Sequence, residues 1–257
     1  MKGLEERIER AARGTPSEIS VLVHDIAPEV LEALLRNPFL SEDHLLTLLN
    51  RKDLPREILQ SVADNEELIR SYRVKLAVVR NPKTPRLVSL RLLKYLYLFD
   101  LVTVTQQPTV SAEIKRRAEE QIINRLEQLA LGQRITLARR CSARVAAALL
   151  ALGDAPVVSV ALDNPFLTEA ELIRLLHRED ISPVVVEQIA SHPKWALRYD
   201  IRLALVRHPL TPLARVLAFL PELTPQDLRL IVSDWAMPAD RRIYIEELLA
   251  RRSRRRL

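Results

Sequence analysis

The stretch RNPKTP at residues 80–85 decides how this chain is expected to fold. It returns as RHPLTP at 207–212, and RNPF at 36–39 begins in the same way. Proline disfavours helical geometry in the residue before it, so each Asn-Pro or His-Pro is predicted to end a helix. The Thr-Pro that follows is predicted to start another, because a threonine oxygen can cap a helix and proline fits its first turn. Each copy therefore predicts a sharp corner between two helices.

The same helix-start signals occur elsewhere along the chain. Ser-Pro or Thr-Pro pairs lie at 15–16, 182–183 and 224–225, and Ser41 and Thr168 are each followed by a glutamate, which favours a helix N-terminus. Between these starts the apolar residues recur at helical spacing, and no sustained alternation argues for strands. The chain is therefore predicted to be all-α.

The predicted helices cover most of the chain. VTVTQQP at 102–108 is β-prone, but we predict a helix there because its counterpart, RLIVSDW at 229–235, follows a Thr-Pro start. The predicted helices are 4–13, 16–24, 28–36, 42–50, 55–63, 66–80, 85–98, 100–106, 111–129, 133–152, 156–163, 169–177, 183–191, 196–207, 212–220, 225–233 and 239–252.

The sequence also repeats itself. NPFL occurs at 37–40 and again at 164–167, and this offset of 127 residues aligns 37–122 with 164–249 without a gap. A shorter period of 44 residues relates the corners within each half. A period in the forties is typical of stacked helical pairs, which bury their apolar faces against the next pair.

The corners resemble those of two known families. A helix ending in Val/Leu-x-Arg-Asn/His-Pro, then Thr-Pro and Leu-rich spacing, is similar to bacterial HEAT-like repeat proteins and to the leucine-rich repeat variant family. The resemblance implies a right-handed solenoid of helical pairs. The iron–sulfur cluster of the variant family is not carried over, because Cys141 is the only cysteine. The residues that carry the resemblance are Arg80, Asn81, Pro82, Thr84, Pro85, Arg207, Pro209, Thr211 and Pro212.

We therefore expect an all-α solenoid of HEAT-like helical pairs. Residues 1–257 would form one domain of two homologous tandem halves, at about 15–130 and 142–250. Because 48% of the residues are hydrophobic, the chain can bury a sizeable core. The basic segment RRSRRRL at 251–257 is predicted to be a disordered tail.

Composition excludes several classes of function. The four glycines are too far apart to form a phosphate-binding loop, and a single cysteine allows neither an internal disulfide nor a Cys-rich metal site. The longest apolar run, 145–152, is too short to span a bilayer. The N-terminus is charged, unlike a signal peptide. We expect a cytoplasmic protein without cofactor, metal or membrane contact.

Positive charge supplies the candidate partner-binding residues. The formal net charge is +6, and much of it lies in the C-terminal tail and in the segment 113–144. Arginine recurs one residue before each corner, where it could bind an acidic partner or cap its own helix end. The candidate residues are Arg36, Arg80, Arg207, Lys115, Arg116, Arg117, Arg139 and Arg140.

Other polar and aromatic residues have alternative explanations. His192 and His208 precede prolines, as Asn81 does, and are expected to be turn residues. Tyr72 and Tyr199 are expected to pack through their rings and to make polar contacts through their hydroxyls, with ligand binding as the alternative. The neighbours Asp234-Trp235 match the acid and aromatic of HEAT-like alkylpurine DNA glycosylases, but the match stops at these two residues.

The sequence favours a binding function. We expect a non-enzymatic cytosolic scaffold or adaptor that binds a protein partner, preferably acidic, through an extended groove. The alternative is a nucleic-acid-binding repeat protein, glycosylase-like at the extreme. The sequence leaves the partner and the oligomeric state open.

Overall fold

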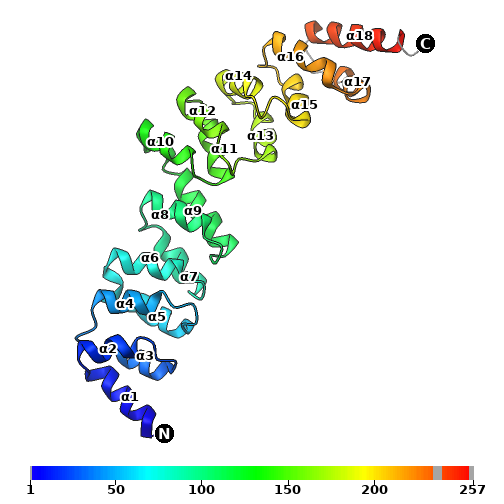
Figure 1. Cartoon of the computed structure of the whole chain (residues 1–257). Helices are drawn as coiled ribbons and strands as arrows, with labels where there is room; N and C mark the ends of the chain where they lie inside the picture. Colours follow the sequence, from blue (N-terminus) through cyan, green and yellow to red (C-terminus); the bar gives the residue numbers. More distant parts are fainter. Residues whose placement is uncertain (1, 234–238, 255–257) are drawn as a thin grey trace. The chain divides into compact units, whose positions relative to one another are not determined.

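The structure is a computed structural model, and it describes residues 2–233 and 239–254. These residues form eighteen α-helices and three short 3₁₀ helices, without a strand (Figure 1). The chain divides into two compact units, Met1–Asn124 and Arg125–Leu257. The all-α prediction is therefore confirmed for the described residues.

The first unit contains nine α-helices and one 3₁₀ helix. They are α1 (Lys2–Arg13), α2 (Pro16–Leu22), α3 (Pro28–Leu34), α4 (Glu42–Leu49), α5 (Arg56–Asp64), η1 (Leu68–Arg70), α6 (Tyr72–Arg80), α7 (Arg86–Leu93), α8 (Leu98–Gln106) and α9 (Ala112–Ile123).

The described part of the second unit contains nine α-helices and two 3₁₀ helices. They are η2 (Leu126–Gln128), α10 (Leu131–Ala138), α11 (Ala143–Ala151), α12 (Ala155–Leu162), α13 (Glu169–Leu176), α14 (Pro183–Ser191), α15 (Tyr199–Arg207), α16 (Leu213–Phe219), η3 (Leu220–Glu222), α17 (Pro225–Ser233) and α18 (Ala239–Arg254).

Helices pack mainly on helices close to them in sequence. In the first unit α4 packs on α6 and α7 on α9, while in the second α13 packs on α15 and α12 on α14. The packing faces are apolar: Leu45, Leu48 and Leu49 are buried on α4, as Leu172 and Leu175 are on α13. This sequential packing is consistent with a helical repeat.

The helical pairs are shorter than the sequence period predicted. Helices α2, α4, α6 and α8 start at residues 16, 42, 72 and 98, so the pairs recur after 26, 30 and 26 residues. Helices α11, α13, α15 and α17 start at 143, 169, 199 and 225, with the same intervals. The 44-residue period is wrong as a structural repeat, because it relates the corner after α3 to the corner after α6.

Four predicted helices are broken in the structure. Residue 71 is extended and separates η1 from α6, so 66–80 is not one helix. The predicted helix 133–152 divides into α10 and α11 around a turn at 139–142, and 85–98 and 111–129 also end early. These breaks contain no proline, and apolar spacing continues through them. The predicted helix in 102–108 is confirmed as far as Gln106.

Thr84 acts differently from its predicted role. Its hydroxyl donates to the carbonyl oxygen of Val78 at 2.5 Å, so it caps the end of α6 rather than the start of α7. Pro85 and Pro212 are the N-cap residues of α7 and α16. By contrast, the predicted caps at Ser41 and Thr168 are confirmed, since each side chain accepts a backbone N–H of its helix.

The predicted C-terminal tail is partly helical. Helix α18 continues to Arg254, so residues 251–254 of the predicted tail are helical. Arg252 donates to the carbonyl oxygens of Leu223 and Pro221 at 2.7 and 2.5 Å, and Arg251 pairs with Glu247. Part of the basic segment therefore packs on the fold.

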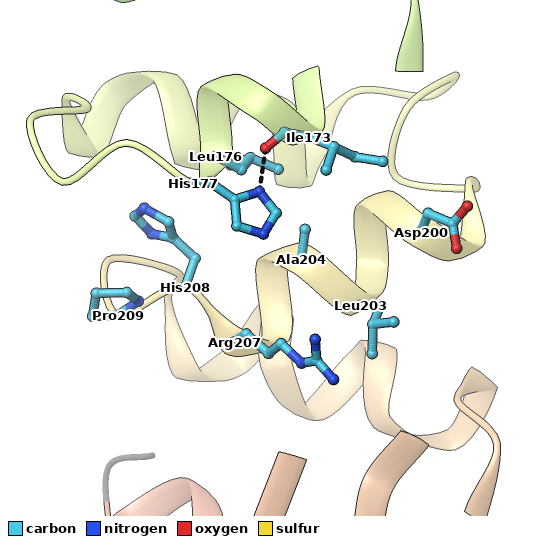
Figure 2. Close-up of a pocket in the computed structure, with 9 residues that line it drawn as sticks. All are labelled: Ile173, Leu176, His177, Asp200, Leu203, Ala204, Arg207, His208 and Pro209. Atoms are coloured by element: carbon cyan, nitrogen blue, oxygen red, sulfur yellow. Dashed lines mark hydrogen bonds between the residues drawn. The ribbon is translucent and has the colours of Figure 1, made fainter. Parts of the chain in front are cut away.

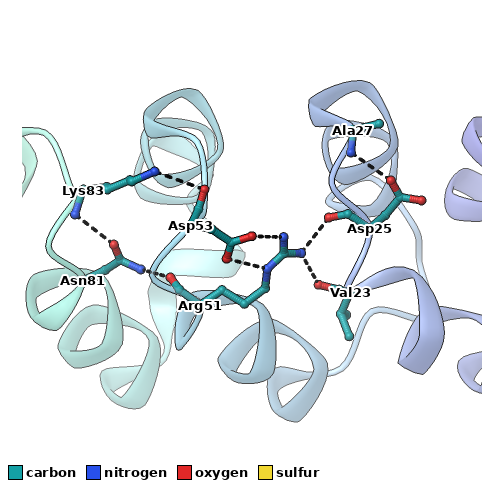
Figure 3. Close-up of polar contacts among 7 residues, drawn as sticks. All are labelled: Val23, Asp25, Ala27, Arg51, Asp53, Asn81 and Lys83. Carbon is teal, nitrogen blue, oxygen red and sulfur yellow. Dashed lines mark hydrogen bonds and ion pairs between the residues drawn. The ribbon is translucent and has the colours of Figure 1, made fainter.

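The first unit has a polar network along successive corners (Figure 3). The Asn81 amide donates to the carbonyl oxygens of Leu49 and Arg51 at 2.9 and 2.7 Å, which ties the end of α6 to the end of α4. The guanidinium of Arg51 in turn donates to the carbonyl oxygens of Val23 and Asp25, both at 2.7 Å. The network therefore links the corners that follow α2, α4 and α6.

Asparagine before proline makes the same link at two other helix ends. Asn37 donates to the carbonyl oxygens of Ala11 and Gly14, beside the end of α1. Asn164 donates to those of Ala138 and Cys141, beside the end of α10. Because an unpaired buried carbonyl is costly, each Asn-Pro both ends its own helix and stabilises the end of an earlier one.

Candidate functional site

The second unit contains a cavity of about 530 Å³ between α13 and α15 (Figure 2). Its wall combines apolar side chains with two histidines, an arginine and an aspartate. The lining residues are Ile173, Leu176, His177, Asp200, Leu203, Ala204, Arg207, His208 and Pro209.

His208 holds its ring in place through the corner backbone. Its Nδ1 lies 3.2 Å from the backbone nitrogen of Leu210, whose N–H it accepts, as the Asn81 oxygen accepts the N–H of Lys83. Nδ1 is thus an acceptor, and in the neutral ring Nε2 carries the proton and can donate. Burial lowers the pKa of His208, and the nearby charges of Arg241 and His177 lower it further. The neutral ring is therefore favoured.

His177 lies opposite His208, at the end of α13 (Figure 2). Its Nδ1 is 2.6 Å from the carbonyl oxygen of Ile173, so this nitrogen carries a proton and donates. The Nε2 atom of the neutral ring remains an acceptor. When both rings are neutral, they have one donor and one acceptor between them.

Charged residues stand at the cavity wall on α15. Arg207 is exposed and, within the described residues, forms no ion pair, whereas its counterpart Arg80 is 3.5 Å from Asp100. Asp200 lies near the start of α15, a distance along the helix from Arg207 (Figure 2). The guanidinium of Arg207 is a charged donor suited to a carboxylate, and His208, Leu203 and Ala204 line the same cavity.

The structure distributes the sequence-predicted site residues over both units. Arg207 lines the cavity, and Arg80 pairs with Asp100. Arg36 is exposed, and within the described residues its side chain forms no hydrogen bond or ion pair. Within the described residues, the side chains of Arg80 and Arg207 donate no hydrogen bond to the carbonyl groups at the ends of their own helices. The predicted capping role is therefore not seen for either. Of these three, Arg207 is the one that lines the cavity between α13 and α15.

The basic middle segment is divided between the units. On α9 of the first unit, Arg116 and Arg117 both pair with Glu120, at 3.7 and 2.8 Å, beside the partly exposed Lys115. In the second unit, Arg139 and Arg140 are exposed at the end of α10. Part of the predicted positive surface is therefore neutralised within its own helix.

Two other predictions concern aromatic and histidine side chains. Tyr72 stacks on Tyr97 and donates its hydroxyl hydrogen to Asp100, which confirms the predicted ring packing and polar contact of Tyr72. His192 accepts the backbone N–H of Lys194, which confirms its turn role. The pair Asp234-Trp235 lies outside the described residues.

Sequence reasoning found Arg207 but missed the cavity. The signal was present in the 127-residue alignment, which places His177 opposite Asn50 and His208 opposite Asn81. Two asparagines of the first unit are thus exchanged for histidines at the ends of α13 and α15. Read singly, His208 was predicted only as a turn residue, and His177 was not singled out.

Within residues 2–233 and 239–254, no group of three His, Cys, Asp or Glu side chains is placed to hold a metal ion. None of the described helices combines the length and apolarity needed to cross a membrane. Comparison with protein families, with curated proteins and with solved structures finds no match to this chain.

Proposed function

We propose that this protein is a non-enzymatic helical-repeat scaffold that binds an acidic side chain of a protein partner in the cavity between α13 and α15. The observation that carries the proposal is that Arg207 and His208 both line a cavity whose wall is otherwise largely apolar. Arg207 forms no ion pair within the described residues, although its charge helps to lower the pKa of Asp227, and an arginine can bind a carboxylate through two parallel hydrogen bonds.

We also propose that the two units arose as homologous halves. The starts of α2 to α9 and of α11 to α18 differ by 127 residues throughout, which is the offset of the sequence alignment. Individual contacts follow the same offset: Tyr72 donates to Asp100, and Tyr199 donates to Asp227. A solenoid of helical pairs in two halves accounts for this agreement.

The duplication supports a binding function for the second unit. In the first unit, Asn81 uses its amide to hold the end of α4. In the second, His208 keeps the turn contact through Nδ1 and lines the cavity, and no hydrogen bond of its Nε2 is seen within the described residues. Replacing Asn81 by His208 thus removes the hydrogen bonds to the preceding helical pair and leaves a ring nitrogen that a ligand could contact.

Binding of a glutamate-containing peptide tests the proposal. Calorimetry would compare acetyl-Leu-Glu-amide with acetyl-Leu-Gln-amide, and we expect the neutral peptide to bind about tenfold more weakly or worse, because it cannot form the charged pair. Arg207→Ala should abolish the preference. Arg229→Ala, an exposed arginine on α17, is the matched control and should leave it unchanged.

A salt titration separates this proposal from nucleic-acid binding. Binding to duplex or single-stranded nucleic acid would weaken steeply between low and physiological salt, because counterions are released. If nucleic acid binds in this way and Arg207→Ala has no effect on it, while neither peptide binds, the proposed function is wrong.

A further inference from the structure

A buried arginine fastens the corner after α15 in the second unit. Arg241, the third residue of α18, is 5% exposed. Its guanidinium donates to the carbonyl oxygens of Val206 and His208 at 3.2 and 2.7 Å, and to those of Pro209 and Thr211, both at 2.8 Å. One cation thus satisfies four carbonyl groups at the negative end of α15.

The matching place in the first unit is a cavity of about 300 Å³. Four of its lining residues, Val79, Asn81, Pro82 and Thr84, lie 127 positions before the four acceptors of Arg241. The residue at the position of Arg241 is Ile114, which is buried at the cavity wall. Isoleucine has no donor for these carbonyl groups.

The backbone of the two corners agrees closely. Asn81 has φ −72° and ψ 125°, and His208 has φ −74° and ψ 126°. The N–H of Thr84 donates to the Asn81 carbonyl, as that of Thr211 does to the His208 carbonyl. Because the turns match, the first corner presents its carbonyl oxygens in the arrangement that binds a guanidinium in the second.

We propose that this cavity of the first unit binds the guanidinium group of an arginine side chain presented by a partner protein. The carbonyl oxygens of Val79, Asn81, Pro82 and Thr84 would accept its hydrogen bonds. Ser89, buried to 96% and without a hydrogen bond from its side chain within the described residues, adds a further acceptor at the wall.

Two arginines also line this cavity and bear on the sign of the ligand. Arg86 is ion-paired with Glu113, so its charge is compensated, and Arg56 is exposed to solvent. Three helices, α5, α7 and α9, begin near the cavity and would favour an anion. However, α14, α16 and α18 begin at the matching positions of the second unit, where a guanidinium binds.

The test uses the full chain and acetyl-arginine-amide as the probe. Amide chemical shifts in NMR spectra should move around the first cavity as the probe is added, and the citrulline analogue, which has the same shape without the charge, should cause no such shifts. The variant Ile114→Arg, which supplies the guanidinium internally, should lose the response. Ile114→Leu is the matched control and should keep it.

A second variant guards against a folding defect. Arg241→Ile should create the equivalent cavity in the second unit, so that the probe moves amides there as well as in the first unit. The proposal fails if arginine and citrulline probes behave alike, if Ile114→Arg still responds at the first cavity, or if inorganic phosphate binds there and the arginine probe does not. It does not depend on Arg207, so it can fail while the carboxylate site stands.

Discussion

The corners at Asn81 and His208 have the same backbone conformation, but their hydrogen bonds to neighbouring helices come from opposite sides. At Asn81 the side chain reaches back to the carbonyl groups at the end of α4, one helical pair earlier. At His208 the hydrogen bond comes from a later helix: the guanidinium of Arg241 on α18 donates to the His208 carbonyl oxygen. Each corner is thus held once, and the side left without a fastening is a cavity in both units.

On the proposed homology of the two units, this difference is a route by which the repeat diversified. The corner itself depends on proline and on one turn contact, which Asn81 and His208 both supply. The contact to a neighbouring helix can then move from one side to the other without changing the path of the chain. The two cavities proposed as binding sites lie where that contact is missing.

The largest expected effect comes from removing the fastening at His208. Arg241→Ile leaves four buried carbonyl groups without their donor, and we expect the free energy of unfolding to fall by about 2–4 kcal/mol. Both tryptophans, Trp195 and Trp235, belong to the second unit, so their fluorescence in urea follows that unit. The exposed Arg229→Ala should be nearly neutral, and an equal loss in both variants would contradict the assignment.

The fastening at Asn81 should matter somewhat less. Asn81→Ala removes two hydrogen bonds to α4 and the turn contact to Lys83, and we expect a loss of about 1–3 kcal/mol. Because the first unit has no tryptophan, circular dichroism in urea is the measurement. Asn50→Ala, at the exposed end of α4, is the control, and equal stability of the two variants would remove the proposed link.

The tyrosine contacts are expected to contribute similarly in both units. The hydroxyl of Tyr72 donates to Asp100 and accepts the N–H of Tyr97, and Tyr199 makes the corresponding contacts to Asp227 and residue 224. Tyr72→Phe and Tyr199→Phe should each cost about 0.5–1.5 kcal/mol.

Burial and Asp100 raise the pKa of Tyr72 to about 12, so its hydroxyl stays protonated in this experiment. Urea unfolding would follow Tyr72→Phe by circular dichroism and Tyr199→Phe by fluorescence. If only one of the two variants is destabilised, the contacts are not equivalent and the proposed homology of the halves is weakened.

Local effects of proline were predictable from the sequence, whereas contacts to carbonyl groups were not. Helices end before Asn81 and His208 as predicted, because proline acts on its immediate neighbour. The breaks at 71 and 139–142 were missed because no proline marks them. Arg241 was missed because its acceptors are backbone atoms, which every residue carries and no sequence pattern reveals.

The repeat length failed for a related reason. The phrase at Asn37 follows α3 and that at Asn81 follows α6, so a shared motif related helices from different positions of the pair. The 127-residue offset, by contrast, agrees with the helix starts because it compares like with like. The same offset aligns Ile114 with Arg241. This exchange of an apolar residue for an arginine was an available sign in the sequence that the two corners differ.

The smallest expected effect is a pH dependence confined to the second corner. The folded-state pKa of His208 lies below its ordinary value of 6.5, so as the pH falls the unfolded chain takes up this proton first. Stability from the neutral ring is therefore complete above about pH 6.5 and is lost as the pH falls towards the folded-state pKa. Between pH 7.5 and 5.5, wild type should lose more stability than His208→Asn, measured by fluorescence in urea.

The variant His208→Asn sharpens the comparison because it gives the second corner the residue of the first. Its amide can donate to the carbonyl oxygens of Leu176 and Arg178, as Asn81 does to those of Leu49 and Arg51. It should therefore also lose binding of the glutamate peptide, since the cavity no longer has its donor. His24→Asn, which changes an exposed histidine of the first unit, should retain both the wild-type pH dependence and the binding. If His24→Asn and His208→Asn follow the same pH curve, the buried ring at the second corner is not the titrating group.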